Sequence, residues 1–275
     1  MIREFIYTAR RFARESWDSR TITWQLAYQK LVKDYKGTAL GVLWAVIQPL
    51  AFVFVFWFAI EIGLRGARSI GHDFPFILWL IPAIFAWRTI TVAISSGGSS
   101  VRANAALVTK AVFPKITIPQ FVVTSLFIVH IALMLLAMII FILTGNMPTI
   151  YWLQLVYAIA ANFIFCLVVA TLLSAITVFS KDLIQFIRVV MTGLFWFSAI
   201  IWPLANLQSM PVVDLVVRLN PIVYVIESYR WSMVYGKWFW EYPLWSLYFW
   251  GFMLLLAVVT VFIWSKVSRY FADVL

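Results

Sequence analysis

Long apolar runs separated by short polar segments constrain this chain more than any other feature of its sequence. The run from Ala39 to Ile60 contains no charged residue, and His130 is the only ionisable side chain in the run from Ile116 to Leu143. A membrane-spanning helix needs about 20 mainly apolar residues, because lipid offers the backbone no hydrogen-bond partners. Since 64% of the residues are hydrophobic and 12% are charged, we predict an all-α integral membrane protein.

Six transmembrane helices account for nearly all of the apolar sequence, which leaves no room for a separate soluble domain. Their predicted ranges are 39–62, 74–95, 116–143, 150–179, 183–202 and 244–265. The rest of this single domain, which covers 1–275, consists of an N-terminal segment (1–38), a loop after the second span (96–115) and a segment before the last span (203–243).

The segment 203–243 is apolar but is divided by proline. Pro211 and the pair Asn220-Pro221 interrupt any helix and leave pieces too short to cross a bilayer. Such pieces are tolerated at membrane depth only when protein buries them or when they line a cavity. We therefore expect re-entrant or interfacial helices between the fifth and sixth spans.

The distribution of basic residues predicts the orientation of the spans. If the N-terminus is cytoplasmic, fifteen Lys and Arg lie in the segments on its side and five lie on the other side. Because cytoplasmic loops are enriched in basic residues, both termini and the 96–115 loop are expected in the cytoplasm, and the re-entrant helices on the extracellular side. The formal charge of +10 then reflects topology and not nucleic-acid binding.

An amphipathic helix is predicted in the N-terminal segment. Its apolar side chains recur at intervals of three and four residues, and polar side chains fall on the opposite face. The first set is Trp24, Tyr28, Leu31 and Tyr35, and the second is Gln25, Gln29, Lys33 and Lys36. This pattern indicates a helix lying on the membrane surface, and a helix packed on a partner protein explains it equally well.

The sequence contains no catalytic or metal-binding motif. It has no HExxH pair and one cysteine, Cys166, and its two histidines, His72 and His130, are far apart. No GxxxxGK[ST] phosphate loop occurs, although SSGGSS at 95–100 is rich in glycine, so the chain is not expected to hydrolyse ATP. For His130, a hydrogen-bonded packing role is favoured over proton relay. An intramembrane enzyme or a proton-driven carrier would need carboxylates or histidines at membrane depth, and the spans hold almost none.

Arg88 lies inside the second predicted span, where an ionised side chain is costly unless it is paired or faces a polar cavity. Two interpretations remain open. The side chain extends to the cytoplasmic interface, or it binds an anionic ligand. Glu227 is the one acidic partner within the chain that the sequence suggests.

Aromatic residues make up 18% of the chain. Within the spans, rings such as Trp44, Phe52 and Phe56 are expected mainly to pack against other helices. Their apolar faces also permit a second interpretation, in which sugar rings or lipid chains move along them.

Three segments resemble signatures of the ABC type-2 permeases that export cell-surface polysaccharides. They are KDYKGTALGVLWAVIQPL (33–50), NAALVTKAVFPKITIP (104–119) and LNPIVYVIESYR (219–230). A fourth, FPFILWLIPAIFAW (74–87), is most similar to the wall teichoic acid translocation permeases of Gram-positive bacteria. O-antigen or capsular polysaccharide permeases are the alternative within this family, and a drug or lipid ABC exporter is a second alternative.

The resemblance implies a protein of the bacterial cytoplasmic membrane that works as a homodimer with two copies of a cytoplasmic ABC ATPase. Mg-ATP would bind the ATPase, so no cofactor and no metal is expected in this chain. The N-terminal helix would be the family's interface helix, and the 96–115 loop would contain a coupling helix that contacts the ATPase. The residues implied in that contact are Asn104, Leu107, Lys110, Phe113 and Pro114.

The cargo that the resemblance implies is an anionic polysaccharide linked to undecaprenyl diphosphate. Its pyrophosphate needs cationic partners. Lys33, Lys36 and Arg88 are the candidates, although Lys33 and Lys36 are equally well explained as charges that fix topology. The full predicted substrate path is Lys33, Tyr35, Lys36, Trp44, Phe52, Phe56 and Arg88.

Overall fold

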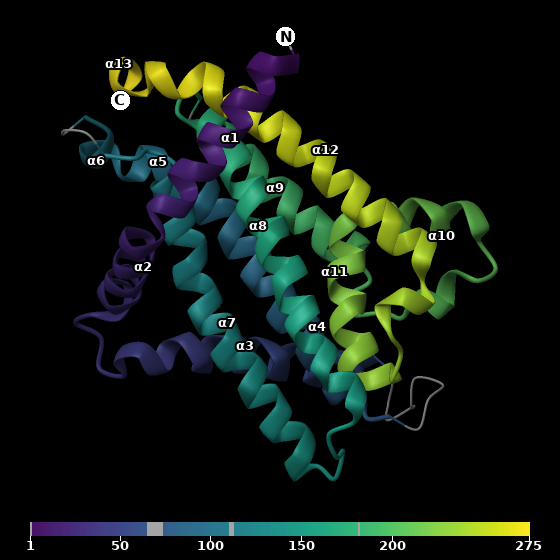
Figure 1. The fold of residues 1–275 in the computed structure, drawn as a ribbon. Coiled ribbons are helices and arrows are strands. Elements are labelled where there is room, and N and C mark those ends of the chain that lie inside the picture. Colours follow the sequence, from purple (N-terminus) through teal and green to yellow (C-terminus); the bar gives the residue numbers. More distant parts are fainter. Residues whose placement is uncertain (1, 65–73, 110–112, 181) are drawn as a thin grey trace.

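The computed structural model describes residues 2–64, 74–109, 113–180 and 182–275, and within these ranges every regular element is a helix. Five helical segments are long and apolar enough to cross a membrane, and both termini lie at the same end of the molecule (Figure 1). The five are Gly41–Gly63, Phe76–Gly97, Thr117–Leu143, Ile150–Thr177 and Pro243–Val274. The all-helical architecture confirms the predicted all-α fold, and the five candidate spans are consistent with a membrane protein. Their bounds lie within a few residues of the first four predicted ranges and the last, except for the C-terminal end of the last.

The five segments are built from α-helices with short irregular turns at their ends. The first comprises the 3-10 turn η1 (Gly41–Leu43), α3 (Trp44–Trp57) and the π-helix η2 (Phe58–Leu64). The second is α4 (Phe76–Val92), extended by the π-helix η3 (Ala93–Gly97). The third is α7 (Thr117–Leu143), and the fourth is α8 (Leu155–Thr177) with the preceding 3-10 helix η4 (Ile150–Gln154). The fifth is α12 (Pro243–Val267), which continues into two short helices at its C-terminal end.

The predicted fifth span is shorter than the sequence suggests. It forms α9 (Asp182–Phe197), whose 16 residues extend about 24 Å, less than the roughly 30 Å of a bilayer core. The helix ends because Ala199 adopts a left-handed conformation with φ of 51°. Hydropathy cannot reveal this stop, since no proline or glycine marks it. The prediction of six spans is therefore not confirmed.

The segment 203–243 folds into short helices separated near the expected prolines. They are η5 (Leu204–Leu207), α10 (Pro211–Arg218), α11 (Pro221–Arg230), the π-helix η6 (Trp231–Tyr235) and the 3-10 helix η7 (Phe239–Glu241). Asn220 caps α11, because its side chain accepts a hydrogen bond from the backbone N–H of Ile222. Every residue of α11 from Ile222 onward is buried, which is the condition under which non-spanning helices persist at membrane depth.

The central helix of the bundle is α4. Every residue from Leu78 to Trp87 is buried, because α3, α7 and α11 pack around it. Its extension η3 packs against α8 at very short range. A Cβ atom at Gly97 would lie 2.6 Å from the Cβ of Ala170, so only glycine permits this contact.

Two helices, α1 (Ile2–Asp18) and α2 (Arg20–Tyr35), precede the first span. Packing of α2 against α7 buries Thr23, Ala27 and Leu31. Trp24 and Tyr28 remain 58% and 59% exposed, so of the predicted apolar face only Leu31 is covered by this chain, and the two rings are left free for the membrane or a partner protein. Small side chains at Thr23 and Ala27 let the helices approach closely, and periodicity alone does not reveal that requirement.

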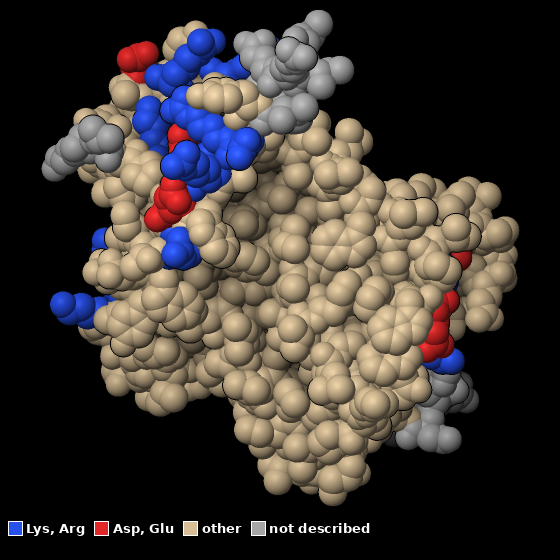
Figure 2. All heavy atoms as spheres, in the orientation of Figure 1, with Lys and Arg blue, Asp and Glu red and all other residues tan. Residues whose placement is uncertain are grey.

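Charged residues gather at the end of the molecule that holds the termini. On the face drawn in Figure 2, Lys and Arg concentrate over α1 and the C-terminal helices, whereas the middle of the molecule is uncharged. The same end carries α5 (Ser100–Ala103), α6 (Ala105–Thr109), the 3-10 helix η8 (Ser268–Tyr270) and α13 (Phe271–Val274).

Candidate functional site

Arg88 has the most defined surroundings of the predicted path residues. It is half-buried on α4, and its Nη2 donates a hydrogen bond of 2.8 Å to Oε1 of Gln48 on α3. The predicted pairing with Glu227 is wrong, because Glu227 binds Arg230 in its own helix. The sequence did not suggest Gln48, because we expected Arg88 to have a charged partner and Gln48 is neutral. Among the described residues Arg88 forms no ion pair, so its charge is available to an anion.

Tyr35, at the end of α2, interacts electrostatically with Arg88. Partial burial raises the pKa of the Tyr35 phenol above its ordinary value, and the Arg88 charge opposes that shift. Lys33 and Lys36 are exposed on either side of Tyr35. The structure thus brings Tyr35 near Arg88, and within the described ranges neither lysine side chain forms a hydrogen bond or an ion pair with these two residues.

Phe52 and Phe56, on successive turns of α3, line a groove of about 460 Å³ between α3, α4 and α9. Their ring centroids are 4.7 Å apart, and Phe56 lies 5.1 Å from Phe195 of α9. Trp87 of α4 reaches the same Phe195 ring at 5.7 Å. Trp44 is half-buried at the start of α3 and lies outside the lining of this groove.

Polar groups complete the lining of this aromatic groove. Thr91 and Ser95 come from α4 and η3, and Arg188 comes from α9. The buried Oγ1 of Thr91 has no hydrogen-bond partner. Arg188 donates to Gln185 at a long 3.3 Å and forms no ion pair within the described ranges. Aromatic faces beside a free guanidinium can hold an apolar chain or a sugar ring next to a phosphate.

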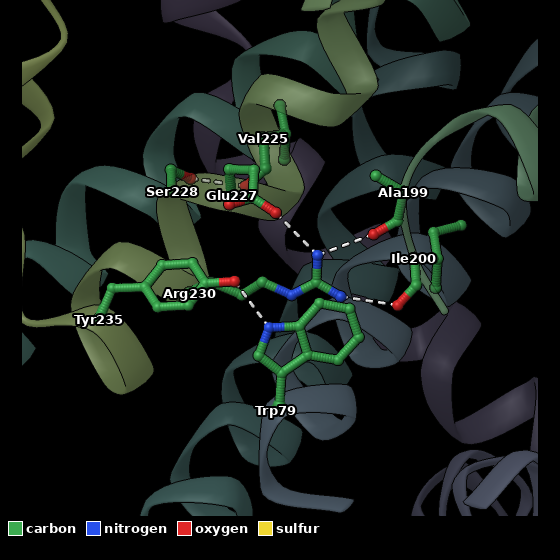
Figure 3. Close-up of polar contacts among 8 residues, drawn as sticks. All are labelled: Trp79, Ala199, Ile200, Val225, Glu227, Ser228, Arg230 and Tyr235. Carbon is green, nitrogen blue, oxygen red and sulfur yellow. Dashed lines mark hydrogen bonds and ion pairs between the residues drawn. The ribbon is translucent and has the colours of Figure 1, made fainter. Parts of the chain in front are cut away.

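A second polar cluster surrounds Arg230, which is fully buried on α11 (Figure 3). Its Nη1 donates to Oε1 of Glu227 at 2.7 Å and to the carbonyl of Ala199 at 2.8 Å. Its Nη2 donates to the carbonyl of Ile200 at 2.6 Å. The guanidinium carbon lies 3.4 Å from the ring centroid of Trp79, which is within the range of a cation–π contact.

The Arg230 cluster joins segments that are far apart in the chain. Nε1 of Trp79 on α4 donates to the hydroxyl of Tyr235 in η6 at 2.7 Å, and Arg230 fixes the two carbonyls that follow α9. This is a structural site that sequence reasoning missed. The signal was present, because Glu227 and Arg230 are three residues apart on one helix, the spacing at which opposite charges meet.

His130 is a packing residue held by hydrogen bonds, as the sequence predicts. It is fully buried on α7, with Thr89 Oγ1 at 2.9 Å from Nδ1 and Tyr229 OH at 2.7 Å from Nε2. Thr89 already donates to the carbonyl of Phe85, so Nδ1 carries the proton and Tyr229 donates to Nε2. Asn162 of α8 donates to the same tyrosine oxygen at 3.2 Å, and the network connects α4, α7, α8 and α11.

The 96–115 loop is fastened to the bundle on both sides. Nη1 of Arg102 donates to the carbonyl of Val178 at 2.9 Å, and Nζ of Lys115 donates to the carbonyl of Ser268 at 3.0 Å. These two basic residues therefore bind this chain itself, which the sequence did not suggest.

The predicted ATPase-contact residues lie in and beside this fastened loop. Asn104 donates to the carbonyl of Ser100 at 2.8 Å. Leu107, Phe113 and Pro114 are half-buried, and Lys110 lies outside the described residues. The part of the loop before residue 110 forms two short helices, α5 and α6.

The described part of the chain contains no cluster of three or more His, Cys, Asp or Glu side chains that could hold a metal ion. Cys166 is a free, buried thiol. The site consists of the aromatic groove and the half-buried Arg88, which among the described residues forms a hydrogen bond only to a neutral amide.

Comparisons with known proteins agree with this arrangement. The model of the ABC-2 type transporter family matches residues 22–234. The chain is similar to the O-antigen export system permease protein RfbA of Myxococcus xanthus, with 26% identity over 223 residues, 80% of this chain and 83% of the relative. It is also similar to RfbA of Klebsiella pneumoniae, with 26% identity over 242 residues, 88% of this chain and 90% of the relative. Because the family match covers most of its length, the chain belongs to the ABC-2 type transporter family.

Proposed function

We propose that this chain is the permease subunit of an ABC exporter that moves a lipid-linked cell-surface polysaccharide across the bacterial cytoplasmic membrane. The observation that carries the proposal is similarity over at least four fifths of the chain to relatives named O-antigen export permeases. The predicted teichoic acid cargo is not confirmed. The names of the relatives favour the alternative, an O-antigen-type polysaccharide.

The proposed energy source is ATP hydrolysis in a separate cytoplasmic subunit. The described residues form membrane helices and short connections, and the sequence has no phosphate-loop motif. The ATPase would bind the loop that holds α5 and α6, next to the basic end of the molecule. Because Arg102 and Lys115 fasten this loop to α8 and to the C-terminal helices, a displacement of the loop would be transmitted to the bundle.

The proposed assembly is a homodimer with two ATPase subunits. Apolar side chains of α3 and α9 are uncovered in the single chain, among them Phe54 at 57%, Val189 at 71% and Phe197 at 66% exposure. A second copy packed along these helices would cover them and enclose the aromatic groove. In this arrangement α9 and the turn after it would form the sixth crossing, with both termini in the cytoplasm.

The proposed substrate path begins at Arg88 and Tyr35 and continues along Phe52 and Phe56. Arg88, which has only the neutral Gln48 as a partner, would hold a phosphate of the lipid carrier. The aromatic groove would accept an apolar or sugar portion of the cargo. ATP binding would draw the two ATPase subunits together and separate the α3 and α9 faces of the dimer.

The test is reconstitution of the purified permease with its ATPase in liposomes. Undecaprenyl-diphosphate-linked O-antigen polysaccharide is supplied on one side, and its appearance on the other side is followed with a lectin. The proposal predicts transport that depends on ATP. Parallel reactions with a lipid-linked poly(glycerol phosphate) polymer and with a fluorescent phospholipid distinguish a teichoic acid exporter and a lipid exporter. Transport of either of these in preference to the O-antigen would contradict the proposal.

A further inference from the structure

A groove of about 610 Å³ lies between the α1–α2 pair and helices α7, α8 and α12, and it shares no lining residue with the aromatic groove. Most of its wall is apolar, with Phe163 and Leu167 from α8 and Ala257 from α12. The same helix, α12, also carries uncovered apolar side chains beside Ala257 in the sequence, such as Leu254 at 69% and Val258 at 40% exposure. In a membrane these faces meet lipid, so the groove is open to acyl chains.

The rim of this groove is polar and carries a cation. Ser16, Arg20 and Thr23 line it at intervals of four and three residues, which places them on one face across the joint between α1 and α2. The buried oxygens Ser16 Oγ and Thr23 Oγ1 have no hydrogen-bond partner. Buried polar groups are normally satisfied, so the unpaired hydroxyls of two residues that line the groove mark this part of its wall as polar.

Arg20 is a cation of the groove lining without a carboxylate partner among the described residues. Arg11, Arg14 and Lys30 each form an ion pair four residues along the helix. Arg20 forms none within the described ranges. Its Nη1 donates to the carbonyl of Trp17 at 3.0 Å, and its guanidinium carbon lies 4.9 Å from the Trp17 ring centroid. These contacts hold the side chain at the rim and leave other N–H groups free to donate.

Two exposed tryptophans flank Arg20 in the sequence and line the same groove. Trp17 is 68% exposed and Trp24 is 58% exposed, and both line the groove. Tryptophan is enriched at the level of lipid headgroups, because its ring is apolar and its N–H is polar. The rim is therefore at headgroup depth, and the apolar wall extends from it toward the acyl chains.

From these observations we infer that the groove binds an anionic phospholipid of the surrounding bilayer. The acyl chains lie against Phe163, Leu167 and Ala257, and the phosphate accepts hydrogen bonds from Arg20 at the polar rim. A lipid in this position bridges the α1–α2 pair and the three long helices. This site is separate from the substrate path proposed above and does not depend on which polymer is exported.

The inference is tested with the full-length purified chain in detergent, titrated with palmitoyl-oleoyl phosphatidylglycerol or with phosphatidylcholine of the same acyl chains, and analysed by native mass spectrometry. One basic residue near an anionic headgroup contributes about 1 kcal/mol. Phosphatidylglycerol should therefore bind about five-fold more tightly, and Arg20→Gln should remove the preference. Arg10→Gln changes an exposed arginine of the same helix pair that does not line the groove, and should leave the preference intact.

Two further measurements separate lipid binding in the groove from a change in the fold. Ala257→Trp should fill the groove and weaken binding of both lipids, and thermal unfolding of each variant verifies that the fold is kept. If Ala257→Trp does not fold, Leu167→Ala replaces it and should weaken both lipids through lost acyl-chain contact. Equal binding of the two lipids, or equal loss of preference in Arg10→Gln and Arg20→Gln, would overturn the inference. Displacement of phosphatidylglycerol by glycerol phosphate, or preferential displacement by undecaprenyl phosphate, would overturn it too and assign the groove to a free phosphate or to the cargo lipid.

Discussion

Replacing Arg230 tests the view that its cluster is a structural fastening at membrane depth. The Arg230→Met substitution removes three hydrogen bonds of 2.6 to 2.8 Å and the contact with the Trp79 ring, and it leaves the buried carboxylate of Glu227 without a partner. Hydrogen bonds to charged groups contribute about 1.5–3 kcal/mol each, but such contributions are not additive. Breaking a buried ion pair costs about 3–5 kcal/mol, and we expect a loss of this size.

The assay is reversible unfolding in mixed micelles of increasing SDS content, followed by tryptophan fluorescence. The Glu227→Gln variant should lose about as much stability, because it leaves a buried guanidinium without its counter-charge. The double variant Glu227→Gln, Arg230→Met should be more stable than either single variant, since no unpaired charge remains. Losses below about 1 kcal/mol in both single variants, or strictly additive losses in the double variant, would refute the argument.

Three other substitutions test separate parts of the structure. Tyr229→Phe removes the donor to His130 and should lower the free energy of unfolding by about 1–3 kcal/mol in the same SDS assay, and an unchanged midpoint would contradict the hydrogen-bond assignment. Arg88→Gln should reduce ATP-dependent export at least ten-fold while the unfolding midpoint stays within error, and full export would remove Arg88 from the path. Lys110→Glu should weaken co-purification of the ATPase, with Arg10→Glu as a matched charge reversal elsewhere on the cytoplasmic side, and equal recovery in both variants would separate Lys110 from that contact.

Features governed by apolar length were predictable from the sequence. The runs that form α7, α8 and α12 are uncharged through most of their length, and hydropathy places them within a few residues. The end of α9 was not predictable in this way. It depends on the left-handed turn at Ala199, and the carbonyls around this turn are fixed by Arg230, which lies about 30 residues further along.

Partners of ionisable residues were predicted less well than their positions. We predicted that Glu227 pairs with Arg88 because their charges are opposite. The spacing of three residues on α11 makes Arg230 the nearer partner of Glu227, and the structure shows this pair. In α2, the apolar pattern could not show that α7 selects the small side chains Thr23 and Ala27 for contact. The wrong partner for Arg88 and the unpredicted contact of α2 have one physical origin, because periodicity describes a single helix and the missing information belongs to its neighbours.

The fastening of Ala199 and Ile200 determines how α9 can move. Arg230 anchors the chain directly after the last turn of α9, whereas the buried residues of the helix itself are confined to one stripe, Ile187, Met191 and Phe195. A rigid helix that is held at one end can rotate about that end. For a helix of about 24 Å, a swing of about 10° displaces the Asp182 end by about 4 Å while Ala199 stays in place. Arg188, which lines the aromatic groove about 16 Å from Ala199 along the helix, would move by about 3 Å in the same rotation, so a small rotation at the anchored turn is enough to widen the groove at its Arg188 end.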